Sequence, residues 1–139
     1  MNYTHQMKKF ISSSGTFTAT FEGAQLKDKK QDPRFPNAKP QQYIMLEFKT
    51  SQGEWVALNV PTKIESYHKA DTLKRITDTR NALGLTETDK WNQAKGKTVT
   101  ITTTPNQFNG KTYFNITTII PFVDTHGQAV QAAKDVFDI

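Results

Sequence analysis

Apolar and polar residues alternate strictly over residues 15–21, where the chain reads GTFTATF. This spacing places two phenylalanines and an alanine on one face and three threonines on the other, as in a half-buried β-strand. Gly23 then interrupts the alternation. A glycine inside a strand often marks a bulge or the bend of a closing barrel, so we expect the strand to bend at Gly23.

Residues 43–50 and 54–60 predict a hairpin, and the apolar pattern decides the length of its loop. A two-residue turn would set apolar residues opposite polar ones, whereas a three-residue loop over 51–53 sets apolar opposite apolar. That loop also puts Gly53 where a bulge favours a left-handed residue. The predicted core pairs are Ile44 with Val60, Leu46 with Leu58, and Phe48 with Val56.

The outer face of this hairpin then carries Tyr43, and Lys49 lies opposite Trp55. An aromatic ring beside a lysine on a sheet surface suits a nucleic-acid ligand. The Trp55 ring could instead pack under the N-terminal arm or under the C-terminal tail.

Residues 97–121 predict another hairpin, because Asn109-Gly110 supplies the two left-handed residues of a type I′ turn. This turn pairs Phe108 with Lys111 and so fixes the register. The face of this hairpin that points away from the core carries Phe108, Lys111, Tyr113 and Ile119. Such rings can bind a ligand or simply stabilise the sheet. The predicted core pairs are Val99 with Ile120, Ile101 with Thr118, Thr103 with Ile116, and Pro105 with Phe114.

Between residues 61 and 96 the apolar spacing becomes that of a helix. Asp71 is the predicted N-cap, and Gly84 is the left-handed residue that ends the helix. A second short helix is expected to begin at Thr86 or Thr88, to end at Ala94 and to bury Trp91. The buried stripe of the first helix is expected to be Leu73, Ile76, the stem of Arg80 and Leu83.

The segment Lys27–Gln42 has three prolines, four lysines and an arginine, which predicts a long exposed loop. Loops of this length in a compact domain are usually functional or disordered. Its cations would suit phosphates and Phe35 would suit a base, although a charged, proline-rich loop can also be merely solvated.

The predicted order is strand, basic loop, strand, strand, helix, strand, strand. The fold class is therefore mainly β with one or two helices. The order is that of the OB-fold, a five-stranded, partly open Greek-key barrel with a helix between strands 3 and 4. We expect one such domain over residues 15–121, an N-terminal arm over 1–14 and a mildly acidic C-terminal tail over 122–139. The arm could extend a binding groove or be a disordered leader.

Composition narrows the class of partner. The 139 residues carry a formal net charge of +5, and every basic residue except Lys134 precedes the tail. This balance favours polyanionic partners. The chain has no cysteine, no apolar N-terminal run that suits a signal peptide and no membrane-spanning stretch of roughly 18 apolar residues. We therefore expect a soluble, cytoplasmic protein.

No group of residues predicts catalysis. His5, His68 and His126 lie far apart in the sequence, without companions at metal-ligand spacing. The carboxylates are scattered singly, usually near a lysine, and Gly96-Lys97-Thr98 lacks the glycine-rich turn of a phosphate loop. We expect neither an enzyme nor a bound metal or cofactor.

Three features point to one family: the element order over residues 15–121, the first strand GTFTATFEG, and the hairpin turn FNGKTY. In these features the chain resembles small single-stranded DNA-binding proteins of the OB-fold type from bacteriophages and plasmids. The resemblance implies a role in DNA replication, recombination or repair inside a bacterial host. It also implies a tail that recruits other replication or recombination proteins, here through Asp135, Phe137, Asp138 and Ile139.

The tail departs from the family pattern. Only two of its last five residues are acidic, whereas the family has acidic tails that end near an aromatic residue. Residues 127–136 could instead form an amphipathic helix.

The pattern and the resemblance together predict a non-catalytic protein that binds single-stranded DNA with little sequence preference. Two alternatives remain: an OB-like protein-interaction module, which could form a homo-oligomer, and an RNA-binding protein, because stacking does not read the sugar. The expected phosphate-binding residues are Lys27, Lys29, Lys30, Arg34, Lys39, Lys49 and Lys111. The expected base-stacking residues are Phe35, Tyr43, Trp55, Phe108 and Tyr113.

Overall fold

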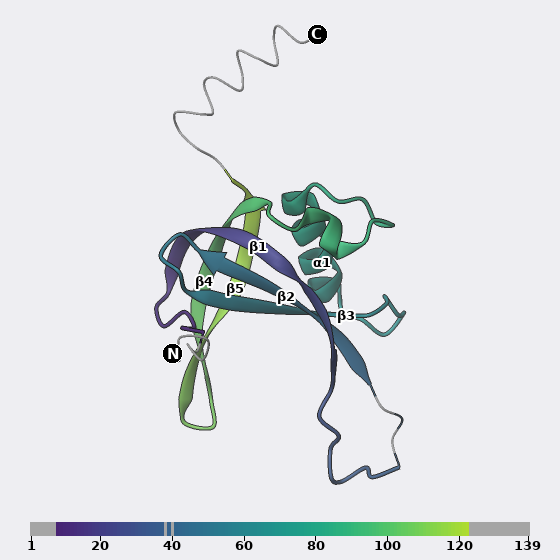
Figure 1. Cartoon of the computed structure of the whole chain (residues 1–139). Coiled ribbons are helices and arrows are strands. Elements are labelled where there is room, and N and C mark those ends of the chain that lie inside the picture. The colour runs from purple at the N-terminus through teal and green to yellow at the C-terminus, as the bar shows by residue number, and fades with distance from the viewer. Residues whose placement is uncertain (1–7, 38, 40, 123–139) are drawn as a thin grey trace, which may run out of the picture.

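The structure, a computed structural model, describes residues 8–37, 39 and 41–122. These residues form a mainly β fold, with a five-stranded antiparallel sheet and one α-helix (Figure 1). In the sheet the strands are ordered β3-β2-β1-β4-β5. In chain order the elements are β1 (Gly15–Asp28), β2 (Gln42–Thr50), β3 (Trp55–Pro61), α1 (Ala70–Leu83), the 3₁₀ turn η2 (Trp91–Ala94), β4 (Thr98–Phe108) and β5 (Lys111–Pro121).

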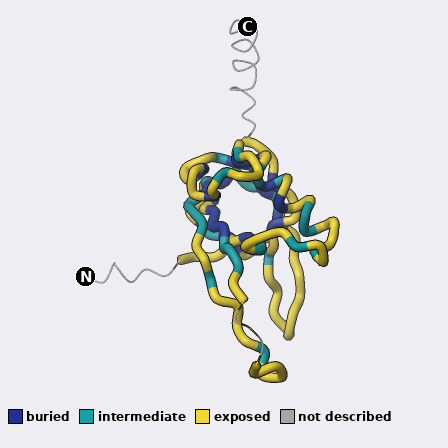
Figure 2. The backbone as a smooth tube through the Cα atoms, turned by 90° about the vertical axis from the view of Figure 1, so that its right-hand side faces the viewer, coloured by how far each residue is buried: buried dark blue, intermediate teal, exposed yellow. Residues whose placement is uncertain are grey.

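The sheet is curved, but it is not closed into a barrel. β3 and β5 are its two edges, and no β-ladder joins them within the described residues. The curved sheet encloses the apolar core, which Figure 2 shows as dark blue segments around a ring. α1 packs against β5 and, with Leu58 of β3, lines a hollow between the two edges. The most completely buried side chains include Phe21, Leu46, Phe48, Val99 and Ile101.

The predicted bend in β1 is confirmed. Between Phe21 and Gly23 the pairing of β1 with β2 shifts by one residue, and Gly23 has a φ of +135°. This bend lets one strand serve two neighbours, because residues 15–20 pair with β4 and residues 19–28 pair with β2. β1 thereby holds the two halves of the sheet together.

The β2–β3 hairpin has the predicted register. Gly53 has a φ of +85°, as a left-handed loop residue should, and Lys49 lies opposite Trp55. The core pattern was decisive here, since each apolar residue of one strand meets an apolar residue of the other. The confirmed pairs are Ile44 with Val60, Leu46 with Leu58, and Phe48 with Val56.

The β4–β5 hairpin also has the predicted register near its turn. Asn109 and Gly110 have φ values of +53° and +76°, as a type I′ turn requires, and Phe108 pairs with Lys111. The predicted pairing holds from there to Thr103 with Ile116.

Beyond Thr103 the predicted register is wrong, because Thr117 forms a bulge in β5. Ile101 therefore pairs with Ile119 instead of Thr118, and Val99 pairs with Pro121 instead of Ile120. One extra residue moves every later side chain to the opposite face. Ile119 is consequently buried, whereas Ile120 is 45% exposed.

The helix ends as predicted but begins differently. Gly84 ends α1 with a φ of +73°, but the N-cap position belongs to Lys69, whose side chain makes no capping hydrogen bond. Asp71, the predicted cap, lies in the first turn, where its negative charge still suits the helix dipole. The buried residues of α1 are Ile76, Thr79, Ala82 and Leu83, and Leu73 and Arg80 are half-buried.

The predicted second helix is only the four-residue turn η2, in which Trp91 is buried as expected. The Arg80 guanidinium lies 4.1 Å from the centroid of the Trp91 ring. The same group donates hydrogen bonds of 2.9 Å to the carbonyl oxygens of Thr86 and Asp89. Arg80 thus fastens the segment after α1 to the helix.

Residues 9–11 of the N-terminal arm lie along the edge of β3. The Trp55 N–H donates to the Lys9 carbonyl (2.8 Å), and the Ile11 N–H donates to the Trp55 carbonyl (2.9 Å). Ile11 is buried, and the Thr103 hydroxyl donates to the Ser13 carbonyl (3.0 Å). This part of the arm therefore runs from β3 to β4 and covers part of an otherwise unpaired sheet edge.

The predicted loop Lys27–Gln42 is shorter in the structure. Lys27 pairs with Tyr43, and Asp28 pairs with Gln42, so both strands continue past the core as a two-stranded ribbon. The Lys29 N–H extends the ribbon by donating to the Gln41 carbonyl (2.7 Å). The predicted loop is too long because its charged residues indicate irregular structure when only the sequence is considered. Backbone pairing in a solvated ribbon does not need an apolar face.

Candidate nucleic-acid interface

Two β-hairpin arms project from the same end of the molecule. The first arm, residues 27–43, is the β1–β2 ribbon with its loop, of which residues 38 and 40 lie outside the described part. The second arm, residues 104–115, is the end of the β4–β5 hairpin. Figures 1 and 2 both show the arms extending in the same direction, away from the core.

The second arm displays two rings and a cation on one face. Phe108 pairs with Lys111, and Asn106 pairs with Tyr113, so alternation places all four side chains together. Phe108 is 63% exposed and Tyr113 is 45% exposed. The type I′ turn fixes the pairing that places both rings on this exposed face.

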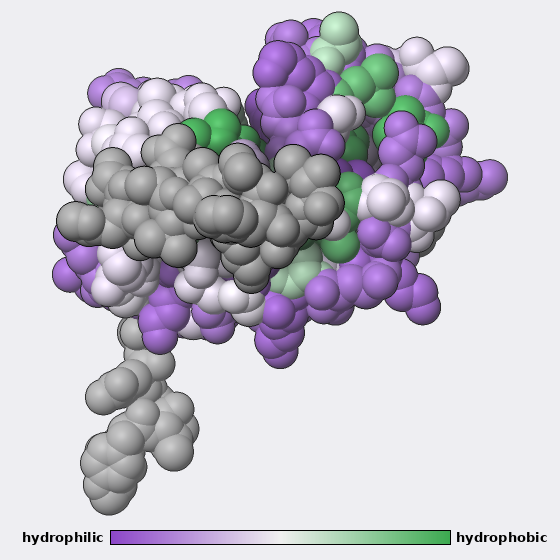
Figure 3. Space-filling view, turned by 90° about the horizontal axis from the view of Figure 1, so that it is seen from above, coloured by the Kyte–Doolittle hydropathy of each residue, from purple (hydrophilic) through white to green (hydrophobic). Residues whose placement is uncertain are grey.

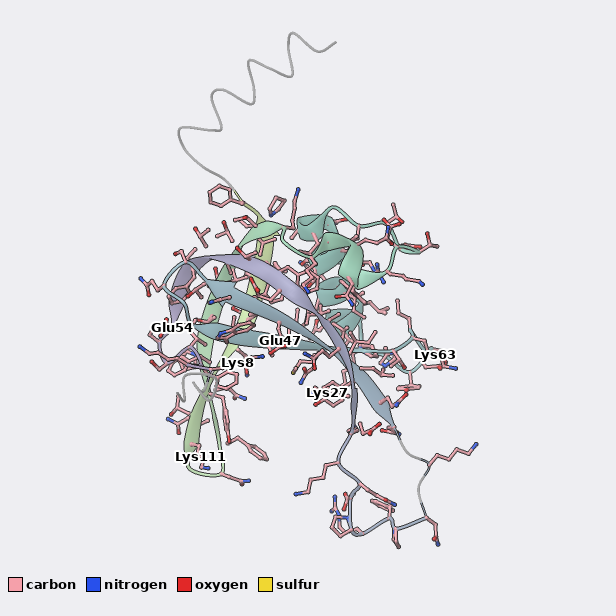
Figure 4. The ribbon with its side chains drawn as sticks, viewed as in Figure 1. Lys8, Lys27, Glu47, Glu54, Lys63 and Lys111 are labelled. Carbon is pink, nitrogen blue, oxygen red and sulfur yellow. The ribbon has the colours of Figure 1, made fainter. Side chains whose placement is uncertain are left out.

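The base of the first arm brings another aromatic residue to a lysine. Lys27 and Tyr43 face each other across the ribbon, and both are half-buried. Lys29 and Lys30 follow directly and are exposed. Figure 4 shows Lys27 where the first arm leaves the body, and Lys111 near the end of the second arm.

At the far end of the first arm, Arg34 is held by Asp32. The Arg34 Nη2 lies 2.7 Å from Asp32 Oδ2, and the Arg34 Nε donates to both carboxylate oxygens at 3.1 and 3.2 Å. The Arg34 guanidinium also lies 5.7 Å from the Phe35 ring centroid. Hydrogen bonds from the Arg34 side chain and backbone lower the pKa of Asp32. The positive charge of Arg34 is therefore largely offset, while Phe35 is 60% exposed.

On the body, Trp55 and Lys49 meet a third residue that the sequence did not single out. The Lys49 Nζ lies 5.6 Å from the Trp55 ring centroid, and the Lys8 Nζ lies 4.2 Å from it. Trp55 is half-buried, and its backbone pairs with residues 9–11. The N-terminal arm therefore packs against Trp55, as one of the two alternatives for this residue predicted, although the ring stays partly exposed.

Lys8 also neutralises an acidic group beside the ring. The Lys8 Nζ donates to Glu47 Oε2 at 2.8 Å, and the Gln25 side chain donates to Glu47 Oε1 at 3.2 Å. The Glu47 side chain is only 10% exposed. An unpaired carboxylate here would repel phosphates, so Lys8 makes this part of the surface compatible with a polyanion. A sequence cannot easily show such a pair, because 39 positions separate the two residues.

The candidate residues therefore form local groups. Lys27 lies with Tyr43, Lys49 with Trp55, Arg34 with Phe35, and Lys111 with Phe108 and Tyr113. Within the described residues, no hydrogen bond or ion pair joins the first arm to the second. Lys39 is exposed on the first arm. The tail residues Asp135, Phe137, Asp138 and Ile139 lie outside the described part of the chain.

The arms are not the whole surface. Figure 3 views the molecule from the end opposite the arms, where hydrophobic residues show as small patches between hydrophilic ones. The described residues contain no group of three or more His, Cys, Asp and Glu side chains that could hold a metal ion. His68 accepts a hydrogen bond at Nδ1 from the Glu65 N–H (2.8 Å), and His5 and His126 lie outside the described residues.

Among the described residues, no helix has the length and apolar character needed to cross a membrane.

Neither a protein-family model nor a curated protein sequence matches this chain.

Proposed function

We propose that this protein has an OB-fold, catalyses no reaction and binds single-stranded DNA with little sequence preference. The observation that carries the proposal is the exposure of Phe35, Phe108 and Tyr113 on two arms that also bear lysines. Every base has a π-face that can stack on such rings, and lysines can follow the phosphates, so neither contact depends on sequence. The proposed role is in DNA replication, recombination or repair, as for the phage and plasmid proteins that the chain resembles.

The strand arrangement supports the OB-fold part of this proposal. OB-folds bind oligonucleotides on the face of strands 2 and 3 and on the loops that join strands 1–2 and 4–5. Here the bent β1 pairs with both β2 and β4, and the two arms are the β1–β2 and β4–β5 connections. The candidate rings and lysines thus lie on the elements that hold oligonucleotides in that fold.

The body adds a cation to the proposed path. Lys49 is exposed and lies over the Trp55 ring, whereas Lys8, which lies over the same ring, is paired with Glu47; Figure 4 shows Lys8 on the body near the base of the second arm. Each stacked ring is expected to contribute about 1–3 kcal/mol to binding. Each phosphate neutralised should steepen the dependence of log K on log salt by about 0.7.

Fluorescence of Trp55 tests the proposal. The chain has two tryptophans, and Trp91→Phe leaves Trp55 as the reporter. Titration with oligo-dT at low salt should quench the emission, and added salt should reverse the quenching.

Two variants test the proposed contacts. Tyr113→Ala should weaken binding of oligo-dT about 5-fold or more. Lys30→Ala should weaken it and lower the salt slope by about 0.7. Circular dichroism checks that each variant folds.

Two results would count against the proposal. If fluorescence does not change and a labelled oligo-dT is not retained at low salt, the protein does not bind single-stranded DNA. A stable homo-oligomer that buries Trp55 would then favour a protein-interaction module. If matched RNA competes better than DNA, the ligand is RNA, because the 2′-hydroxyl distinguishes the two.

A further inference from the structure

A groove of about 1140 Å³ opens where the base of the first arm meets the segment after β3. The first arm contributes Lys29 and Tyr43, and the segment after β3 contributes Lys63, Tyr67 and His68. Two tyrosines, a histidine and two lysines thus line one groove. The sequence pattern predicted a role for Lys29 and Tyr43 but gave no role to the residues across from them.

Tyr67 is the most exposed of the large hydrophobic residues that the structure describes, with 76% of its surface open to water. Its ring lies 4.5 Å from the His68 ring, centroid to centroid. His68 is itself fixed by a turn, since its Nδ1 accepts from the Glu65 N–H (2.8 Å) and its own N–H donates to the Glu65 carbonyl (3.1 Å). Tyr67 is therefore supported on one side and open on the other, and an oriented ring loses little freedom when a base stacks on it.

The charges in the groove suit a phosphate. Lys63 lies 3.2 Å from Glu65, so the acidic residue of this segment is already paired. Lys29 forms no ion pair with any described residue. Lys29 therefore brings a positive charge, unpaired among the described residues, to the groove from the first arm, whereas Tyr67 belongs to the segment after β3.

We propose that this groove is a second nucleotide subsite, in which a base stacks on Tyr67 and the adjoining phosphate binds Lys29. The subsite takes a nucleotide of the same DNA strand that the arms hold, so this inference rests on the proposed function. It extends the bound strand from Tyr43 on the sheet to the segment between β3 and α1. Stacking alone holds the base, so the subsite accepts any of the four bases.

A comparison of oligomer lengths tests the subsite. Tyr67→Ala should weaken the binding of long oligo-dT about 5-fold or more, and it should leave the binding of the shortest bound oligomers unchanged, since these need not reach the groove. Ile64→Ala is the matched control, because Ile64 is 60% exposed in the same segment but does not line this groove. Ile64→Ala should change neither the affinity for long oligo-dT nor the affinity for short oligo-dT.

Photocross-linking gives a second readout. An oligo-dT that carries 5-iodouracil should form a cross-link to the tryptic peptide 64–69, which contains Tyr67, and Tyr67→Ala should abolish it. If long oligomers bind the Tyr67→Ala and wild-type proteins equally and no cross-link falls in this peptide, the subsite is wrong, while the proposed function stands. If the wild-type protein binds no oligomer of any length, both proposals fail.

Discussion

At the scale of single residues, the surface mixes groups that are free to bind a polyanion with groups that are already engaged. Arg34 is engaged by Asp32, and Lys8 is engaged by Glu47. A sequence predicts lysines and arginines as phosphate ligands from their charge alone. In the folded protein, an ion pair with a carboxylate can make such a cation unavailable to a phosphate. The contribution of each cation therefore depends on its nearest carboxylate.

The Asp32–Arg34 pair gives a prediction about pH. Since Arg34 lowers the pKa of Asp32, Arg34→Gln should raise that pKa toward 3.8, the ordinary value for aspartate. A lowered folded-state pKa means that the stabilising contribution of the pair is present above the unfolded pKa. It is lost as the pH falls through the folded pKa. Carboxyl NMR shifts during an acid titration measure the change, and an unaltered Asp32 pKa in the variant would contradict it.

The same pair gives a prediction about binding. Asp32→Asn should release Arg34, so that affinity for oligo-dT rises at low salt and the salt slope steepens by up to about 0.7. The double variant Asp32→Asn with Arg34→Gln is the control, and it should lose the gain. Equal affinity of the wild-type and Asp32→Asn proteins would show that Arg34 does not reach a phosphate.

Lys8 and Glu47 give a prediction about stability. Lys8→Met leaves the nearly buried Glu47 carboxylate without its cation and should lower the free energy of unfolding by about 1 kcal/mol. Adding Glu47→Gln should restore most of that loss, since the neutral amide needs no counter-charge. Urea unfolding measures all three proteins. A double variant as unstable as the single one would mean that Lys8 acts through Trp55 instead.

At the scale of elements, the sequence predicts what apolar pairing or turn chemistry determines. The β2–β3 register follows from three apolar pairs, and the β4–β5 turn follows from Asn109-Gly110. The bulge at Thr117 could not be predicted, because Thr117 and Thr118 are chemically identical and either can be the unpaired residue. The groups around Trp55 were predicted only in part, since Lys8 reaches that ring through tertiary structure.

The turn of the second arm gives an element-scale prediction. Gly110→Ala forces a non-glycine residue to a φ of +76°, which should cost about 1 kcal/mol and loosen the arm that carries Phe108 and Tyr113. Affinity for oligo-dT should therefore fall. Gly53→Ala is the matched control, because Gly53 has a φ of +85° in the β2–β3 loop, away from both arms. It should lower stability to a similar extent without weakening binding; an equal loss of affinity in both variants would make the effect one of general stability.

At the scale of the whole molecule, the open sheet separates the core from the proposed interface. The core residues lie inside the curved sheet, whereas Phe35, Phe108 and Tyr113 belong to the arms, which extend beyond it as exposed segments in Figure 2. Substitutions on the arms can thus change binding without changing the core. This separation is what allows the contribution of each arm to be measured by itself.

The two arms should act on one strand only when that strand is long enough to reach both. With long oligo-dT, Phe35→Ala on the first arm and Tyr113→Ala on the second should each weaken binding. Their effects on the free energy of binding should add, because no hydrogen bond or ion pair joins the arms within the described residues. With short oligo-dT, which can occupy one arm or the other, either single variant should lose little affinity, whereas the double variant should lose most of it.

Isothermal titration across a series of oligomer lengths separates these cases. If the single variants lose equal affinity at every length, the two rings contact the same few nucleotides, and the picture of two separate arms holding one strand is wrong.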